Sequence, residues 1–178
     1  MQKPNGSKRK EFAMKAIIKL YFTVIIVAYS LLVFEAKPCE ALEPTTYDMI
    51  MLDRINSYRQ ANGLSALEYD EDLVSVANWR VSELPTNFDH LRPNGDSYKT
   101  VYTELGLADK YERGSENIAM LDGWDFASEE ECVDFIFEAY KNSEAHNANI
   151  LKPYWQYYGG SYLVSHNGKC YQIQVFAK

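Results

Sequence analysis

The end of the sequence constrains the fold most, because it has the pattern of a β-hairpin. Residues 155–165 and 169–177 each have the composition of a strand, and Asn167-Gly168 between them is a strong turn signal. The second run alternates apolar and polar residues: Tyr171, Gln172, Ile173, Gln174 and Val175. This alternation predicts a closing hairpin with one buried face.

Helical segments precede this hairpin. Apolar residues recur every three or four positions over residues 46–61, 70–84, 97–107 and 128–142. Asp70 and Ser128 stand where the second and fourth segments need N-caps, and Ser128 with Glu131 forms a capping box. Helices followed by a hairpin predict an α+β or layered α-β-α domain with an antiparallel sheet.

The first 41 residues have the features of a secretion signal. Basic residues precede an apolar run of fifteen residues from Leu20 to Phe34, shorter than the roughly twenty that a membrane span needs. Small residues at Cys39 and Ala41 predict cleavage before Leu42, and an uncleaved signal anchor is the alternative. In both cases residues 42–178 form one domain, secreted or facing the outside of the cell.

The charge of this domain excludes some partners. Residues 1–41 hold seven of the 18 basic residues and three of the 25 acidic ones, which leaves eleven basic and twenty-two acidic residues in 42–178. Such a surface repels phosphate backbones, so we expect no nucleic-acid partner. We also expect no stable membrane association after cleavage of the signal.

Cys132 and Cys170 remain in the domain after cleavage. In an oxidising compartment they could form a disulfide closing a loop of nearly forty residues, which would contribute about 3–4 kcal/mol. Free buried cysteines are equally common as core fillers. Both alternatives are open from the sequence.

The three histidines differ in their surroundings. His166 flanks the hairpin turn and is expected to be exposed. His90 precedes a Pro-Asn-Gly turn and lies two residues before Arg92, so in extended chain both would face the same way. His146 follows the fourth helical segment in a polar turn. Each has a structural interpretation, as a surface loop residue or a corner residue, beside a functional one.

Glu116 lies in an apolar stretch and should be partly buried. A buried carboxylate needs a partner or a shifted pKa. A structural role, in which it accepts backbone hydrogen bonds, is as compatible with the sequence as a chemical one.

Four motifs carry a resemblance to a known family. They are His90-Leu91-Arg92-Pro93-Asn94-Gly95, Ser115-Glu116-Asn117-Ile118-Ala119, the spaced set Tyr140, Ser143, His146, Asn149, Ile150 and Leu151, and Tyr158-Gly159-Gly160-Ser161-Tyr162. In this order they resemble the CAP superfamily of cysteine-rich secretory, venom-allergen and pathogenesis-related (SCP-like) proteins, in its short microbial form. The resemblance covers nearly all of residues 47–178. Ser115 and Tyr140 depart from the family's glycine and tryptophan.

The resemblance implies the family's α-β-α sandwich with a cleft lined by two histidines and acids. The matching cleft positions are His90, Arg92, Glu116, Asn117, Ser143 and His146. The family's second glutamate has no confident match, although Glu138 and Glu144 are near. His90, Glu116 and His146 are therefore the candidate ligands for Zn²⁺ or another divalent cation.

The favoured function is a non-enzymatic extracellular module that binds a small ligand, lipid or protein partner through this cleft. One alternative is a metal-assisted extracellular hydrolase, peptidase-like, with Glu116 as the base. The sequence lacks an HExxH helix and a G-x-S-x-G elbow. Another alternative is an interaction role in a cell envelope or spore coat.

Overall fold

The computed structural model describes residues 46–123 and 126–178. The predicted signal segment, Cys39 and the cleavage site before Leu42 lie outside the described residues. Within the two described ranges, no helix is long and apolar enough to cross a membrane.

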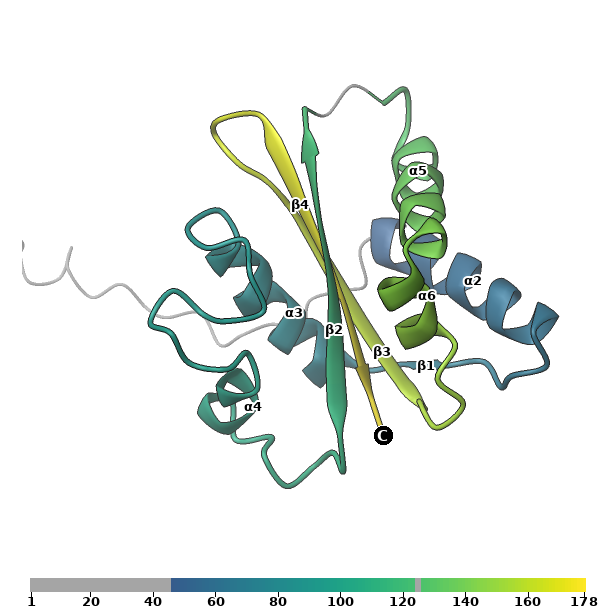
Figure 1. Cartoon of the computed structure of the whole chain (residues 1–178), viewed down its shortest axis with the longest axis horizontal. Helices are drawn as coiled ribbons and strands as arrows, with labels where there is room; N and C mark the ends of the chain where they lie inside the picture. Colours follow the sequence, from purple (N-terminus) through teal and green to yellow (C-terminus); the bar gives the residue numbers. More distant parts are fainter. Residues whose placement is uncertain (1–45, 124–125) are drawn as a thin grey trace, which may run out of the picture. The chain divides into compact units, whose positions relative to one another are not determined.

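A four-stranded sheet forms the centre of the fold (Figure 1). Its order is β1 (Glu68–Tyr69), β3 (Tyr157–Val164), β4 (Lys169–Ala177) and β2 (Gly114–Asp122). The predicted hairpin is confirmed: β3 and β4 pair antiparallel, and β4 pairs antiparallel with β2. The two-residue β1 is the exception to the expected antiparallel sheet, because it runs parallel to β3.

Helices cover both faces of the sheet (Figure 1). α2 (Thr46–Ala61), α5 (Glu129–Asn142) and α6 (Glu144–Ile150) lie on one side, and α3 (Glu71–Glu83) and α4 (Thr100–Glu104) on the other. Each side has its own apolar core, one around Phe176 and the other around Ile173, strand positions whose side chains face opposite ways. The predicted α-β-α sandwich is confirmed.

Two predicted caps are present. The Asp70 carboxylate accepts hydrogen bonds from the backbone N–H groups of Asp72 and Leu73 at 2.9 and 3.1 Å. Ser128 Oγ accepts from Glu131 N at 3.1 Å, and the Glu131 carboxylate reaches back to Ala127 N at 2.7 Å. The second contact is one residue earlier than a standard capping box, and it still satisfies a free N–H at the helix entrance.

The predicted helix over residues 97–107 is shorter in the structure. Before α4, Thr100 N bonds to Ser97 O at 3.0 Å and Val101 N bonds to Tyr98 O at 3.1 Å. These contacts span three residues and form tight turns, not α-helix. Gly106, with φ +73°, ends the segment in the left-handed region.

The chain after α5 is also helical, so the predicted polar turn at Glu144 and His146 is wrong. Ser143 has extended backbone and separates α5 from α6, and Asn147 N bonds to Ser143 O at 2.8 Å. His146 therefore lies on a short helix, which fixes its backbone more firmly than a turn would.

Both faces of β4 are buried, so the prediction of a single buried face is wrong. Gln172 and Gln174 are fully buried on the side of α2 and α5. The Gln172 amide oxygen accepts from Tyr140 Oη at 2.6 Å, and that of Gln174 accepts from Asn117 Nδ2 at 3.0 Å. These hydrogen bonds offset the free-energy cost of burying the two side-chain amides. The alternation pattern predicted that both amides would face water.

Of the two open alternatives for the cysteines, the structure has the free, buried one. Cys132 on α5 and Cys170 on β4 have no disulfide and are 0 % and 1 % exposed. Burial raises the pKa of Cys132 to about 12 and that of Cys170 to about 11. Because the thiolate is the reactive form, both should be inert in the folded protein.

We predict that residues 42–178, folded at about pH 8, react with a thiol reagent far more slowly than a free cysteine does. In denaturant, both Cys132 and Cys170 should react at once, because burial no longer suppresses the thiolates. Ellman's assay with and without guanidinium measures this. No reactive thiol in non-reducing denaturant would show that a disulfide had formed instead.

Gly159 on β3 allows α3 to approach the sheet closely. A Cβ at this position would lie 2.4 Å from the backbone carbon of Leu73 and 2.4 Å from the backbone nitrogen of Val74. No real Cβ contact is that short, and helix backbone moves less easily than a side chain. The Gly-Gly motif of the sequence thus sets the spacing between helix and sheet.

Gly159→Ala should therefore lower the free energy of unfolding by about 3 kcal/mol, measured by urea denaturation. Gly95→Ala is the matched control, because it has φ +87° but nothing within 4 Å of the added Cβ. It should cost only about 1 kcal/mol, from backbone conformation alone. Equal losses in the two variants would contradict the close-approach explanation.

Candidate functional site

A buried ion pair lies beneath the candidate site. Arg80 comes from the last turns of α3 and is fully buried, and Glu116 comes from β2 and is 5 % exposed. Arg80 Nε lies 3.1 Å from Glu116 Oε2 and Arg80 Nη2 lies 3.0 Å from Oε1, a two-pronged contact. The remaining donors reach Glu83 Oε2 at 2.7 Å and the carbonyl of Asp89 at 2.9 Å. The partner that Glu116 needed is therefore an arginine.

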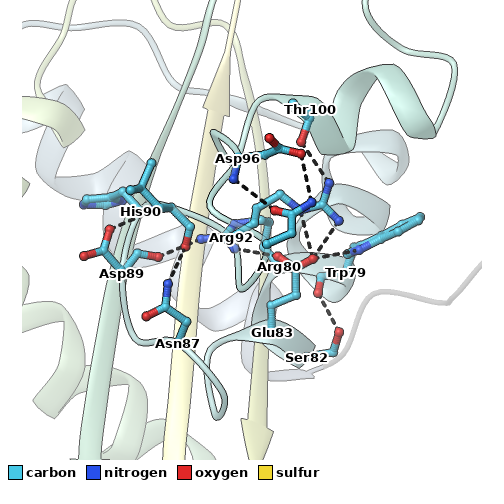
Figure 2. A network of polar contacts seen from close by, with 12 residues as sticks. Trp79, Arg80, Ser82, Glu83, Asn87, Asp89, His90, Arg92, Asp96 and Thr100 are labelled. Carbon is cyan, nitrogen blue, oxygen red and sulfur yellow. Dashed lines mark hydrogen bonds and ion pairs between the residues drawn. The ribbon is translucent and has the colours of Figure 1, made fainter.

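His90 rests on this pair (Figure 2). Its Nδ1 lies 3.0 Å from Glu116 Oε1, and its side chain is 54 % exposed. The hydrogen bond to Glu116 raises the pKa of His90 above its ordinary value, although partial burial opposes the shift. With Nδ1 engaged, the other ring nitrogen, Nε2, has no partner among the described residues and can accept a ligand.

Arg92 lies on the other side of this network from His90, with Glu83 and Trp79 (Figure 2). Its guanidinium contacts Glu83 at 2.7 Å and Glu104 at 2.5 Å. The expectation that His90 and Arg92 face the same way is wrong, because the chain turns at Arg92, whose N–H bonds to Asp96 O at 2.8 Å. Arg92 fixes the loop that carries His90.

His146 approaches β2 from the opposite face of the sheet. Its carbonyl accepts a hydrogen bond from Asn117 Nδ2 at 3.3 Å, and its ring packs edge-on against Tyr140 with centroids 5.0 Å apart. Burial lowers the pKa of His146, and the positive charge of His90 lowers it further. The structure thus places one histidine against Glu116 and the other against Asn117, adjacent residues of β2.

Asn117 joins the parts of this framework and is 1 % exposed. It donates to Gln174 of β4 and accepts from Asn149 Nδ2 of α6 at 2.9 Å, so it connects β2, β4 and α6. Ser143 occupies the N-cap position of α6, but its side chain makes no capping hydrogen bond.

The three candidate ligands do not form a cluster of metal-binding side chains. Within residues 46–123 and 126–178, no group of three or more His, Cys, Asp or Glu side chains is placed to hold a metal. The reason is local, since both Glu116 oxygens are bonded to Arg80 and His90. Glu138 and Glu144 are exposed, and Glu138 pairs with Lys141 at 2.6 Å.

Sequence reasoning missed Arg80, which holds Glu116 in place. A signal was available: a single arginine lies among apolar residues in the segment 70–84, three positions before Glu83. Charged residues on the buried face of a helix are rare unless they are paired. Its partner is Glu116, the acidic residue that the sequence places in another apolar stretch.

Comparison with known proteins identifies the family of this chain. The sequence profile of the CAP family, described as the cysteine-rich secretory protein family, matches residues 52–176. The chain belongs to the CAP family. It is 28 % identical over 123 residues to the uncharacterized protein YkwD of Bacillus subtilis, which covers 68 % of this chain and 44 % of YkwD.

Two solved structures have the same fold as this CAP chain. An outer surface protein of Borrelia burgdorferi has a TM-score of 0.60 at 21 % identity, over 76 % of this chain and 96 % of the Borrelia protein. An extracellular protein containing an SCP domain from Bacillus anthracis has a TM-score of 0.57 at 21 % identity, over 74 % of this chain and 40 % of that one. The chain thus spans less than half the length of YkwD and of the Bacillus anthracis protein.

The opposite pKa shifts predict distinct titrations of His90 and His146. By NMR, His90 should titrate above the ordinary value of 6.5 and His146 below it. The stabilisation from protonated His90 is complete below pH 6.5 and is lost as pH rises through its higher folded pKa. His146 has the opposite effect, since the folded state loses stability as pH falls through 6.5 toward its lower folded pKa.

Glu116→Gln separates the causes of these shifts. It removes the carboxylate that stabilises the imidazolium, so the pKa of His90 should fall while that of His146 still lies below 6.5. An unchanged His90 titration in a folded variant would contradict the Glu116 contact.

Proposed function

We propose that this CAP domain is an extracellular module that binds ligands and has no hydrolase activity. Its site is the pair of imidazoles of His90 and His146. The supporting observation is the Arg80–Glu116 ion pair, which holds His90 by Nδ1 and leaves Nε2 available. A fixed, half-exposed imidazole opposite a second one suits ligand binding.

The residues fit a divalent cation in a particular way. Imidazole nitrogen is a preferred ligand of Zn²⁺, and a metal-bound histidine usually donates its other N–H to a carboxylate. Glu116 would thus orient His90, and the two histidines would hold the metal. The metal would supply open coordination positions, which a small ligand, a lipid headgroup or a protein side chain could take.

A neighbour of the same fold supports testing zinc first. NaASP2 was crystallised with Zn²⁺; its TM-score to this chain is 0.55 at 12 % identity, over 78 % of this chain and 82 % of NaASP2. At this identity the likeness concerns the fold, so zinc binding by the present chain rests on its own histidines.

The contacts of Glu116 argue against the hydrolase alternative. A general base must reach a water molecule, and the Glu116 side chain is 1 % exposed with both oxygens bonded. Among the described residues, no serine or cysteine hydrogen-bonds to either histidine ring. We therefore place a role in partner binding, including one at a cell envelope, above catalysis.

Zinc titration by calorimetry tests this proposal. The unchanged chain should bind one Zn²⁺, and His90→Ala or His146→Ala should each weaken binding at least about ten-fold, because one of two imidazole ligands is lost. His166→Ala is the matched control: His166 is exposed in the hairpin loop, so its removal should change nothing.

Two results would contradict the proposal. Zinc affinity that survives both His90→Ala and His146→Ala, or that depends on His166, would place the metal elsewhere. Zinc-dependent turnover of peptide or ester libraries, lost in His90→Ala, would support the hydrolase instead.

A further inference from the structure

One long edge of the sheet has no partner among the described residues. β2 has nine residues, lies at the end of the strand order and pairs only with β4. At its start, Arg113 and Lys178 exchange both backbone hydrogen bonds, Lys178 N to Arg113 O at 3.1 Å and Arg113 N to Lys178 O at 3.4 Å. This fixes which residues of β2 bond to β4, because such pairs alternate along an antiparallel ladder.

The alternation directs every second residue of β2 to the free edge. Ser115, Asn117 and Ala119 form the bonded pairs with β4. The backbone N–H and C=O groups of Glu116, Ile118 and Met120 therefore point away from β4, and within the described ranges no residue hydrogen-bonds to them. Gly114 has the same parity, and its carbonyl accepts from Tyr98 Oη on that outer side at 3.1 Å.

The free edge runs between the two histidines. His90 contacts the side chain of Glu116 on one face of β2, and the backbone of His146 contacts the side chain of Asn117 on the other. Figure 1 shows β2 between the α3–α4 side and the α5–α6 side. A strand laid along this edge would pass the site.

The surroundings favour apolar side chains and positive charge. Phe88 and Met120 are 43 % and 37 % exposed. Both are neighbours of Tyr171: the Phe88 ring is 6.1 Å from that of Tyr171, and Met120 is opposite Tyr171 in the ladder. Asp89 directly precedes His90, and Glu144 lies two residues before His146; both acids are exposed and have no ion-pair partner among the described residues.

We propose that the free edge of β2 binds an extended, positively charged peptide segment of a partner protein as a fifth strand. Backbone groups of Glu116, Ile118 and Met120 hydrogen-bond to the segment, and Phe88 and Met120 contact its alternate apolar side chains. This proposal rests on the proposed function, because it names the class of partner that the module binds. The edge and the zinc site can be tested separately.

Phage-displayed random peptides of about nine residues, the length of β2, serve as the probe. Panning against the whole chain should select sequences that alternate apolar residues with lysine or arginine. Met120→Pro should weaken a selected synthetic peptide at least about ten-fold, because it removes an outward N–H and places a ring on the edge. Met120→Thr, the matched comparison, keeps that N–H and loses only the apolar contact of the Met120 side chain, so it should weaken binding clearly less than Met120→Pro does.

Amide hydrogen exchange supplies a second measurement on the unchanged chain. The peptide should slow exchange at Ile118 and Met120, while Asn117 and Ala119, already bonded to β4, change little. His90→Ala with His146→Ala should abolish zinc binding and preserve exchange protection by the peptide, so the two proposals fail independently.

Three outcomes would overturn the edge proposal. They are selection of no peptide with this alternation, unchanged exchange at Ile118 and Met120 under saturating peptide, and equal affinity of the Met120→Pro and Met120→Thr variants. Self-association of the unchanged chain that Met120→Pro abolishes would assign the edge to a second copy, and that too would overturn it.

Discussion

The buried ion pair between Arg80 and Glu116 is the contact on which the site depends. Removing two charges from water is costly, and the cost is offset only when every donor and acceptor has a partner. Here Arg80 also reaches Glu83 and the carbonyl of Asp89, so α3, β2 and the loop before Arg92 are joined at one guanidinium. Burial opposes ionisation of Glu83, but hydrogen bonds from Arg92 and Arg80 keep its pKa below the ordinary value. The network extends through Arg92 to Glu104 of α4. At the opposite end of the network, His90 contacts Glu116.

A second, uncharged network plays the same part on the other side of the sheet. Asn117 connects Gln174 of β4 with Asn149 of α6, and its amide also bonds to the carbonyl of His146. Amides cost less to bury than ions, but each unmet bond would still be penalised, so the network favours one position of α6 over its neighbours. Each histidine is therefore held by a polar framework that begins on β2, at adjacent residues whose side chains leave opposite faces.

The sequence predicted the elements better than their contacts. Asn167-Gly168, Asp70 and Ser128 act locally, and the hairpin and the two helix entrances that they indicate are present. The alternation pattern wrongly predicted that Gln172 and Gln174 face water. Their burial depends on hydrogen-bond partners that lie 32 and 57 residues away in the sequence. Glu116 and Arg80 are likewise 36 residues apart. The apolar sequence around Glu116 therefore indicated that this carboxylate needs a partner, but it could not identify which residue the partner is. The motif that contains Arg92 identified the right loop, and only the turn at Asp96 shows that Arg92 holds it in place.

An open edge beside this site needs a physical explanation. Proteins usually protect long edge strands by a charge, a proline or a covering element, since free N–H and C=O groups pair readily with other chains. β2 has nine residues without proline, and two of them are charged. Asp122, the last residue, is exposed and pairs with Lys169 at 3.1 Å, whereas Glu116 is turned inward to Arg80, where it cannot repel an approaching strand. The same ion pair that positions His90 therefore leaves the middle of the edge without an exposed charge. This unprotected part of the edge lies beside the two histidines. We therefore regard the edge as part of the binding surface and not as a defect of the fold.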